Sequence, residues 1–125
     1  MRLLNSFFNI VSYNDDSNQC HVVSIKLNPE HVIYQAHFPG KPVTPGVCII
    51  AMVTEVLEQW KQLKLNLTRV KNLKFVGIVS PLECHNVEIV YQSVEETGDT
   101  LKAKGFLRNE GNILTKFSII YKTVQ

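Results

Sequence analysis

The stretch HFPGKPVTPGVCIIAMVTEVLEQW, residues 37–60, decides the fold of this chain. Its first ten residues hold three of the five prolines and two of the six glycines. Thr44-Pro45-Gly46 is typical of a helix start, because threonine can cap free backbone amides and proline suits the first helical position. Nothing breaks a helix before about Leu63, so the sequence predicts one helix of roughly 27 Å.

The predicted helix changes character along its length. Residues 47–53 are apolar on every side, which is typical of a helix that is buried all round. Polar side chains begin at Thr54 and Glu55 and continue to Gln62. We therefore expect the first half of the helix to lie deep and the second half to reach solvent.

Most of the remaining chain alternates apolar and polar residues, which is the pattern of half-buried strands. This alternation predicts strands near residues 19–28, 86–94, 101–108 and 113–122, and the glycine-containing turns EETGD and RNEGN separate the last three. Residues 69–81 predict a further strand, which Pro81 would end. One helix and an antiparallel sheet make an α+β chain.

Length and composition limit the function classes. The 125 residues fit a single domain, 1–125, and a net charge of +2 is too small to indicate nucleic-acid binding. The three cysteines form no C-x-x-C pair, so we expect reduced thiols in a cytoplasmic protein, without disulfide, metal or cofactor. The start, MRLLNSFFNIVSY, is only slightly like a signal peptide, and the longest apolar run is too short to cross a membrane.

The segment HFPGKPVTPGV, residues 37–47, closely resembles the signature of the 3-hydroxyacyl-acyl-carrier-protein dehydratases of fatty acid synthesis. Eleven consecutive positions fit, including the histidine and both Pro-Gly pairs. Weaker echoes, NPEHVIYQAHFPG at 28–40 and LKFVGIVSPLE at 73–83, extend the resemblance over nearly the whole chain. The resemblance implies a hotdog fold, in which an antiparallel sheet wraps around one long central helix.

The resemblance also implies a site that dehydrates 3-hydroxyacyl thioesters. Such a site needs a base for the C2 proton, a donor to the thioester oxygen and an acid for the leaving hydroxyl. His37 matches the family's base, which the backbone carbonyl at the position of Val43 holds in place. Gly46 matches the glycine whose N–H points at the thioester oxygen, and Val47 beside it would contact substrate. The family builds its site from two chains, so we expect a homodimer or a higher homo-oligomer.

One position departs from the family pattern. The family's acid, Glu or Asp, lies fourteen residues after the histidine, where this chain has Ala51 in the substrate site. Four interpretations stay open. Glu55, one turn later on nearly the same helix face, could supply the acid, or a related chain with Glu at this position could supply it in a heterodimer. Alternatively, water replaces the acid and activity is slow, or the chain binds acyl carriers without chemistry.

The segment from Lys61 to Pro81 is basic and contains no acidic residue. It is either a solvated edge or a dock for an acidic acyl carrier protein, whose phosphopantetheine arm holds the acyl chain. The residues predicted to dock the carrier are Lys64, Arg69, Lys71 and Lys74. The segment lacks interleaved aromatic residues, which argues against nucleic acid.

The sequence therefore predicts a (3R)-3-hydroxyacyl dehydratase-like protein of fatty acid, lipid or polyketide synthesis, impaired by Ala51. The first alternative is a non-catalytic hotdog subunit that binds acyl chains or pairs with an active relative. The second is a hotdog thioesterase in which Glu55 activates water, although such thioesterases usually lack the stiff HFPG loop.

Overall fold

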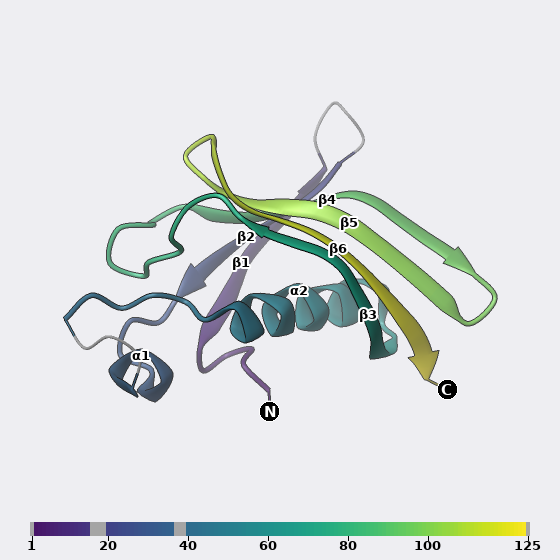
Figure 1. The fold of residues 1–125 in the computed structure, drawn as a ribbon, viewed down its shortest axis with the longest axis horizontal. Coiled ribbons are helices and arrows are strands. Elements are labelled where there is room, and N and C mark those ends of the chain that lie inside the picture. Colours follow the sequence, from purple (N-terminus) through teal and green to yellow (C-terminus); the bar gives the residue numbers. More distant parts are fainter. Residues whose placement is uncertain (1, 16–19, 37–39, 125) are drawn as a thin grey trace.

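A computed structural model describes residues 2–15, 20–36 and 40–124, and His37 lies outside them. The elements are β1 (Phe8–Asp15), β2 (His21–Leu27), α1 (Val32–Ala36), α2 (Gly46–Lys61), β3 (Lys64–Phe75), β4 (Val87–Thr97), β5 (Thr100–Asn109) and β6 (Asn112–Val124). The strands form one antiparallel sheet in the order β1-β2-β4-β5-β6-β3. The sheet curves over α2, which lies along its concave side (Figure 1). The α+β hotdog architecture expected from the sequence is confirmed.

The core fills the space between α2 and the concave face of the sheet. Alternate residues of β2, β4, β5 and β6 enter it as predicted, among them Val23, Ile25, Ile89, Tyr91, Leu101, Ala103, Leu107, Phe117, Ile119 and Tyr121. The hydroxyl of Tyr91 donates to the carbonyl oxygen of Val53 at 2.6 Å, so the sheet is also hydrogen-bonded to the helix. Gly105 is required where β5 passes β4, because a Cβ atom there would collide with the carbonyl oxygen of Val90.

The start of α2 differs in detail from the prediction. Pro45 is the residue before the first helical turn, and no side chain among the described residues caps the helix. The expected cap, Thr44, instead bonds the hydroxyl of Tyr34 at 2.7 Å. The helix ends at Lys61, because Gln62 adopts a left-handed conformation with φ 55° and its N–H donates to the carbonyl oxygen of Glu58.

The buried residues of α2 lie along one face in both halves of the helix, and its first half is not buried on every side. Val47, which the apolar run places in a buried turn, is 71% exposed, whereas Val56 and Leu57 in the second half are fully buried. The prediction of an all-round buried first half is therefore wrong at Val47. No helix within residues 2–15, 20–36 and 40–124 is long and apolar enough to cross a membrane.

The position of strand β3, at one edge of the sheet, differs from the prediction. The strand expected at 69–81 is β3, Lys64–Phe75, and it ends six residues before Pro81. Its register against β6 skips Thr68 and Lys71, so two bulges interrupt the alternation. These bulges keep Leu65, Leu67, Val70, Leu73 and Phe75 opposite the concave-facing residues of β6. Strand β1 and the short helix α1 were not predicted.

Candidate active site

Residues 40–45 form the described part of the loop that leads into α2. The backbone N–H of Thr44 donates to the carbonyl oxygen of Val79 at 2.8 Å, while its hydroxyl bonds that of Tyr34. Tyr34 is buried on α1, and its ring stacks on Phe7 with centroids 4.7 Å apart. Burial raises the pKa of Tyr34 well above its ordinary value, so the phenol keeps its proton for this bond. The loop is therefore anchored at Thr44, two residues before the helix.

The first two backbone amides of α2 are open donors. The N–H groups of Cys48 and Ile49 both donate to the carbonyl oxygen of Pro45, at 3.0 and 3.1 Å. Within the described ranges, the N–H groups of Gly46 and Val47 donate to no protein acceptor. They lie at the positive end of a 16-residue helix, where a developing negative charge is stabilised. This geometry suits an oxyanion of a thioester.

Phe75, at the end of β3, lies against Gly46. A Cβ atom built on Gly46 would lie 2.9 Å from Cζ of the Phe75 ring, which no real Cβ contact tolerates without movement. The ring is 57% exposed, so it forms part of the outer wall beside the helix start. The sequence does not identify this residue, because Phe75 and Gly46 are far apart in the chain and only the fold brings them together.

Val43 and Val47 flank the helix start. Val43 is partly buried, and Val47 points to solvent. Beside the loop lies a hollow of about 310 Å³, lined by Gly40, Lys41, Pro42, Val43, Ile78, Ser80, Leu82 and Glu83. The predicted site residues Val43, Gly46 and Val47 are thus brought together at one end of α2, and the predicted base, His37, stays a prediction.

Ala51 lies five residues after Gly46 on the same helix, partly buried against the core. Its methyl group can neither donate nor accept a proton. One turn further along, the hydroxyl of Thr54 donates to the carbonyl oxygen of Ile50 and bonds the Tyr121 hydroxyl, each at 2.8 Å. Between Gly46 and Thr54, α2 carries no acidic side chain.

Glu55 is buried, with 5% of its surface exposed, although polar residues of α2 were expected to reach solvent from Thr54 onward. Each of its carboxylate oxygens accepts a hydrogen bond from the backbone N–H of Leu3 at 2.9 Å. One oxygen also accepts from the N–H of Leu4 at 2.8 Å. The expectation of a solvated Glu55 is wrong, because the segment before β1 folds onto the carboxylate. Its role as a catalytic acid stays a prediction.

Cys48, beside the site on α2, is a buried core residue. Burial raises the pKa of its thiol, which disfavours the thiolate that a nucleophile requires.

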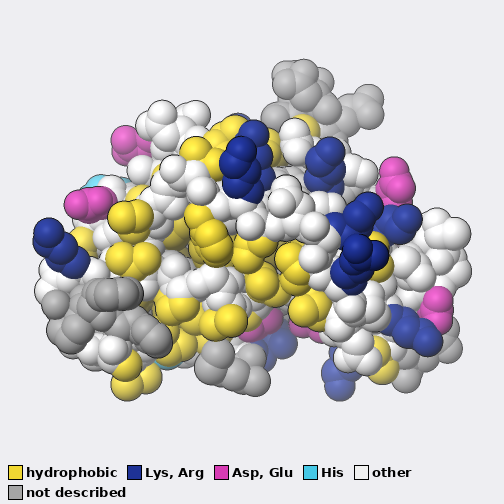
Figure 2. All heavy atoms as spheres, viewed as in Figure 1, with side chains coloured by type: hydrophobic (Ala, Val, Ile, Leu, Met, Phe, Trp, Pro, Cys, Tyr) yellow, Lys and Arg dark blue, Asp and Glu magenta, His cyan; other side chains and the backbone are white. Residues whose placement is uncertain are grey.

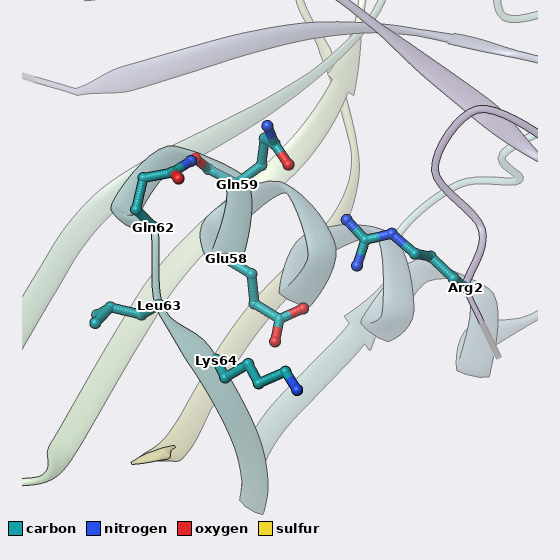
Figure 3. A pocket seen from close by; sticks show the side chains of 6 residues that line it. All are labelled: Arg2, Glu58, Gln59, Gln62, Leu63 and Lys64. Carbon is teal, nitrogen blue, oxygen red and sulfur yellow. The ribbon is translucent and has the colours of Figure 1, made fainter. Parts of the chain in front are cut away.

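The predicted carrier-docking residues all lie on β3 and are all exposed: Lys64, Arg69, Lys71 and Lys74. None of them forms an ion pair with a described residue. Lys64 lies apart from the rest, in a hollow of about 320 Å³ at the far end of α2 (Figure 3). Glu58 and Lys64 point into this hollow, and Arg2 approaches from the other side.

Comparison with known proteins identifies the family. The family model described as ApeI-like, ApeI dehydratase, matches residues 13–105. A 3-hydroxyacyl-[acyl-carrier-protein] dehydratase FabZ from Clostridium acetobutylicum is 31% identical over 99 residues, which cover 74% of this chain and 69% of the relative.

Solved structures agree on the fold. The dehydratase heterocomplex ApeI:P from Xenorhabdus doucetiae contains a chain that matches with a TM-score of 0.65 and 16% identity, covering 90% of this chain and 96% of that one. A variant of the thioesterase PA1618 from Pseudomonas aeruginosa matches with a TM-score of 0.60 and 11% identity, covering 94% and 81%. At such identities these structures share the fold alone. On the strength of the family model and the FabZ relative, this chain belongs to the ApeI-like dehydratase family.

Proposed function

We propose that this chain takes part in the dehydration of carrier-bound (3R)-3-hydroxyacyl thioesters in the cytoplasm. The observation that carries the proposal is the pair of open amides at Gly46 and Val47, at the positive end of α2 and directly after the HFPG loop. Two preorganised donors at a helix start stabilise an enolate oxygen without reorganising when charge develops.

The reaction divides into three tasks. His37 takes the proton from C2, and the electron pair of that C–H bond is delocalised onto the thioester oxygen as an enolate before it forms the C2–C3 double bond. Negative charge on the thioester oxygen is held meanwhile by the amides of Gly46 and Val47, and Val43 lines the approach. The C3–O bond then breaks, and the departing hydroxyl needs a proton to leave as water.

The third task has no donor at Ala51. Glu55 lies one turn further on, but its oxygens already hold the amides of Leu3 and Leu4. A proton delivered from Glu55 would require the start of the chain to detach. We therefore favour a donor from a second chain, a relative with Glu at the position of Ala51. A chain alone would then be slow by about 10²–10⁴-fold, the usual effect of a missing general acid.

Assembly from two chains fits this requirement. The exposed Val47 and Phe75 next to the helix start are apolar surfaces that a second chain can cover. The ApeI:P structure of Xenorhabdus doucetiae is a heterocomplex, which supports a pair of non-identical chains as one form of this assembly. A homodimer or larger homo-oligomer is the other form.

An acidic acyl carrier protein is the proposed source of substrate. Its dock would be the exposed cations of β3, of which Lys74 lies directly opposite Lys116 on β6. Two like charges opposite each other destabilise the sheet unless a counter-charge approaches. Carrier affinity should therefore fall as salt rises, and reversing Lys71 and Lys74 to Glu should weaken it at low salt. Unchanged affinity after this reversal would mean that the cations form only a solvated face.

The experiment that tests the function separates its steps. A 3-hydroxyacyl thioester is incubated with the chain in D₂O, and NMR follows both exchange at C2 and formation of the enoyl product. A site with a base and an oxyanion cradle but no acid should exchange C2 faster than it dehydrates. His37→Ala should abolish both reactions, whereas His85→Ala, which alters an exposed histidine outside the site, should change neither.

The second candidate function is a non-catalytic subunit that binds acyl chains or pairs with an active relative. The methyl group of Ala51 where the family has an acid favours it. Absence of both exchange and dehydration, in a folded chain that still binds the acyl carrier, would establish this alternative. Hydrolysis of the thioester without dehydration would establish the thioesterase interpretation.

A further inference from the structure

One face of α2 is left open by the rest of the chain. Its members follow helical spacing and none of them is fully buried: Val47, Ile50, Ala51, Thr54 and Glu58. Residues three and four positions apart on a helix are neighbours, so these side chains form one continuous row, which we call the open stripe. Figure 2 shows apolar side chains gathered across the face on which α2 and β3 lie. The open stripe begins at the helix start, where the unpaired amides lie.

Thr54 supplies the hydroxyl group of the open stripe. The members before it, Val47, Ile50 and Ala51, are apolar, and α2, which the structure describes in full, has no other Ser, Thr or Tyr. The hydroxyl of Thr54 donates to the carbonyl oxygen of Ile50 at 2.8 Å. That carbonyl belongs to the peptide bond that leads into Ala51. The hydroxyl therefore lies at the level of Ala51, beside the position where the family has its acid.

The hydrogen bonds of Thr54 leave it one acceptor position. The phenol of Tyr121 comes from the buried face of β6 and lies 2.8 Å from Oγ1 of Thr54. Burial is the main cause that raises the pKa of Tyr121 to about 12, so the phenol keeps its proton. Because the hydrogen of Thr54 is engaged with Ile50, the phenol donates to Thr54. A hydroxyl oxygen has two lone pairs, and the second can accept a hydrogen bond from a ligand.

The carboxylates of α2 that follow Ala51 are already engaged. Glu55 holds the start of the chain, and one oxygen of Glu58 accepts from the N–H of Leu65 at 2.9 Å. Ala51 itself offers only a methyl group. Along the open stripe, Oγ1 of Thr54 is therefore the first side-chain acceptor that a substrate held at the helix start can reach.

The spacing suits a 3-hydroxyacyl thioester. Ala51 lies five residues beyond Gly46, which is about 7.5 Å along the helix axis. In the substrate, four covalent bonds separate the thioester oxygen from the C3 oxygen, so these two oxygens lie about 3–4 Å apart. With a hydrogen bond of about 2.8 Å at each end, the substrate spans this length of helix. A saturated acyl chain could form the first of these hydrogen bonds but not the second.

We propose that Thr54 recognises the C3 hydroxyl of the substrate, which donates to Oγ1 of Thr54 while the thioester oxygen lies at the amides of the helix start. An acceptor binds this hydroxyl but gives it no proton. Thr54 therefore adds selectivity for 3-hydroxyacyl chains and does not replace the missing acid. The inference rests on the proposed function and adds the residue that selects its substrate.

Isothermal titration calorimetry with two unreactive probes tests the inference. The probes are pantetheine analogues that carry a (3R)-3-hydroxyhexanoyl or a hexanoyl group, with an amide in place of the thioester. An amide acidifies C2 much less than a thioester does, so the hydroxylated probe is not dehydrated. Wild type should bind the hydroxylated probe about three- to tenfold more tightly than the saturated one, as expected for one neutral hydrogen bond.

Substitutions at Thr54 separate recognition from stability. Thr54→Val keeps the shape of the side chain and removes the hydroxyl, so the two probes should bind equally. The matched control, Thr54→Ser, keeps the hydroxyl and should keep the preference. Thr54→Ala removes the hydroxyl with a residue that favours helices, and it covers the case in which Thr54→Val folds poorly. The readout is the ratio of the two affinities, because a loss of stability alone weakens the binding of both probes together.

Two results would overturn the inference. One is a preference for the hydroxylated probe that survives in both Thr54→Val and Thr54→Ala. The other is the lack of any preference in wild type, including the case in which neither probe binds. A preference that depends on Thr54, in a chain that neither exchanges C2 nor dehydrates the thioester, would count against the proposed function alone. Dehydration without such a preference would count against this inference alone.

Discussion

The backbone nitrogen of Leu3 lies 2.9 Å from each carboxylate oxygen of Glu55, so one buried side chain of α2 holds the start of the chain. Glu55→Gln replaces one acceptor oxygen by an N–H₂ donor that faces a backbone donor. We expect the free energy of unfolding to fall by about 1.5–3 kcal/mol, the usual range for hydrogen bonds to charged groups. Urea denaturation measures the change.

Glu95→Gln is the control for this prediction, because Glu95 is exposed on β4 and should leave stability within about 0.5 kcal/mol. A stable Glu55→Gln protein that had lost all dehydratase activity would contradict the structural role and make Glu55 the acid.

The contact between Gly46 and Phe75 predicts a coupled pair of mutations. Gly46→Ala would place a methyl group 2.9 Å from the Phe75 ring, but the ring is the far end of an exposed side chain and can move. We expect Gly46→Ala to destabilise the wild type and to have less effect, or a stabilising one, in a Phe75→Ala background. A double-mutant cycle should give a coupling energy of about 0.5–1 kcal/mol. Strict additivity would mean that the two residues do not touch in solution.

The sequence predicts the parts of this fold whose signal is local. The prolines before Gly46 fix the start of α2 to within a residue, and the alternation in β2, β4, β5 and β6 identifies the buried face of each strand. Strand β3 was displaced because the bulges at Thr68 and Lys71 break the period on which the reading depends. Strand β1 was missed because Asn9 and Ser12 interrupt an apolar run whose Val11 is itself exposed.

The candidate site shows the same limit. The motif brings Val43, Gly46 and Val47 together, and the structure places them at one helix end. The burial of Glu55 depends on Leu3 and Leu4, more than fifty positions away in the chain, so no local sequence pattern predicts it. Phe75 belongs to the wall of the site only because β3 ends beside Gly46.

Thr115 offers a way to raise stability. It is fully buried on β6, and its hydroxyl has no hydrogen-bond partner in the part of the chain that the structure describes. Thr115→Val replaces this hydroxyl by a methyl group of similar size, so the free energy of unfolding should rise by about 1 kcal/mol. Thr54→Val is the matched comparison: it removes a hydroxyl that bonds Ile50 and Tyr121, and it should lower stability. Calorimetry measures the stability of both variants. A destabilised Thr115→Val would mean that this hydroxyl has a partner in solution.

Tyr121 predicts a loss of stability in alkali. Burial is the main cause that raises the pKa of Tyr121 from 10.0 to about 12, partly offset by its bond to Thr54 and assisted by Glu58. Between these values the unfolded chain releases the phenolic proton and the folded chain retains it, so stability is full below pH 10 and falls as the pH rises toward 12. The free energy of unfolding of Tyr121→Phe should fall less steeply over this range than that of wild type. Parallel slopes would show that Tyr121 does not contribute.

The central claim is that the site keeps its base and its oxyanion donors but lacks the acid. A substitution at Ala51 tests this claim. The most direct measurement is the rate at which Ala51→Glu and wild type form the enoyl product from a 3-hydroxyacyl thioester. We predict that wild type alone is slow or inactive and that Ala51→Glu is faster, by up to about 10²–10⁴-fold, less the cost of burying the new carboxyl group. A wild type that is already fast, that Ala51→Glu does not improve and that Glu55→Gln abolishes, would contradict the account.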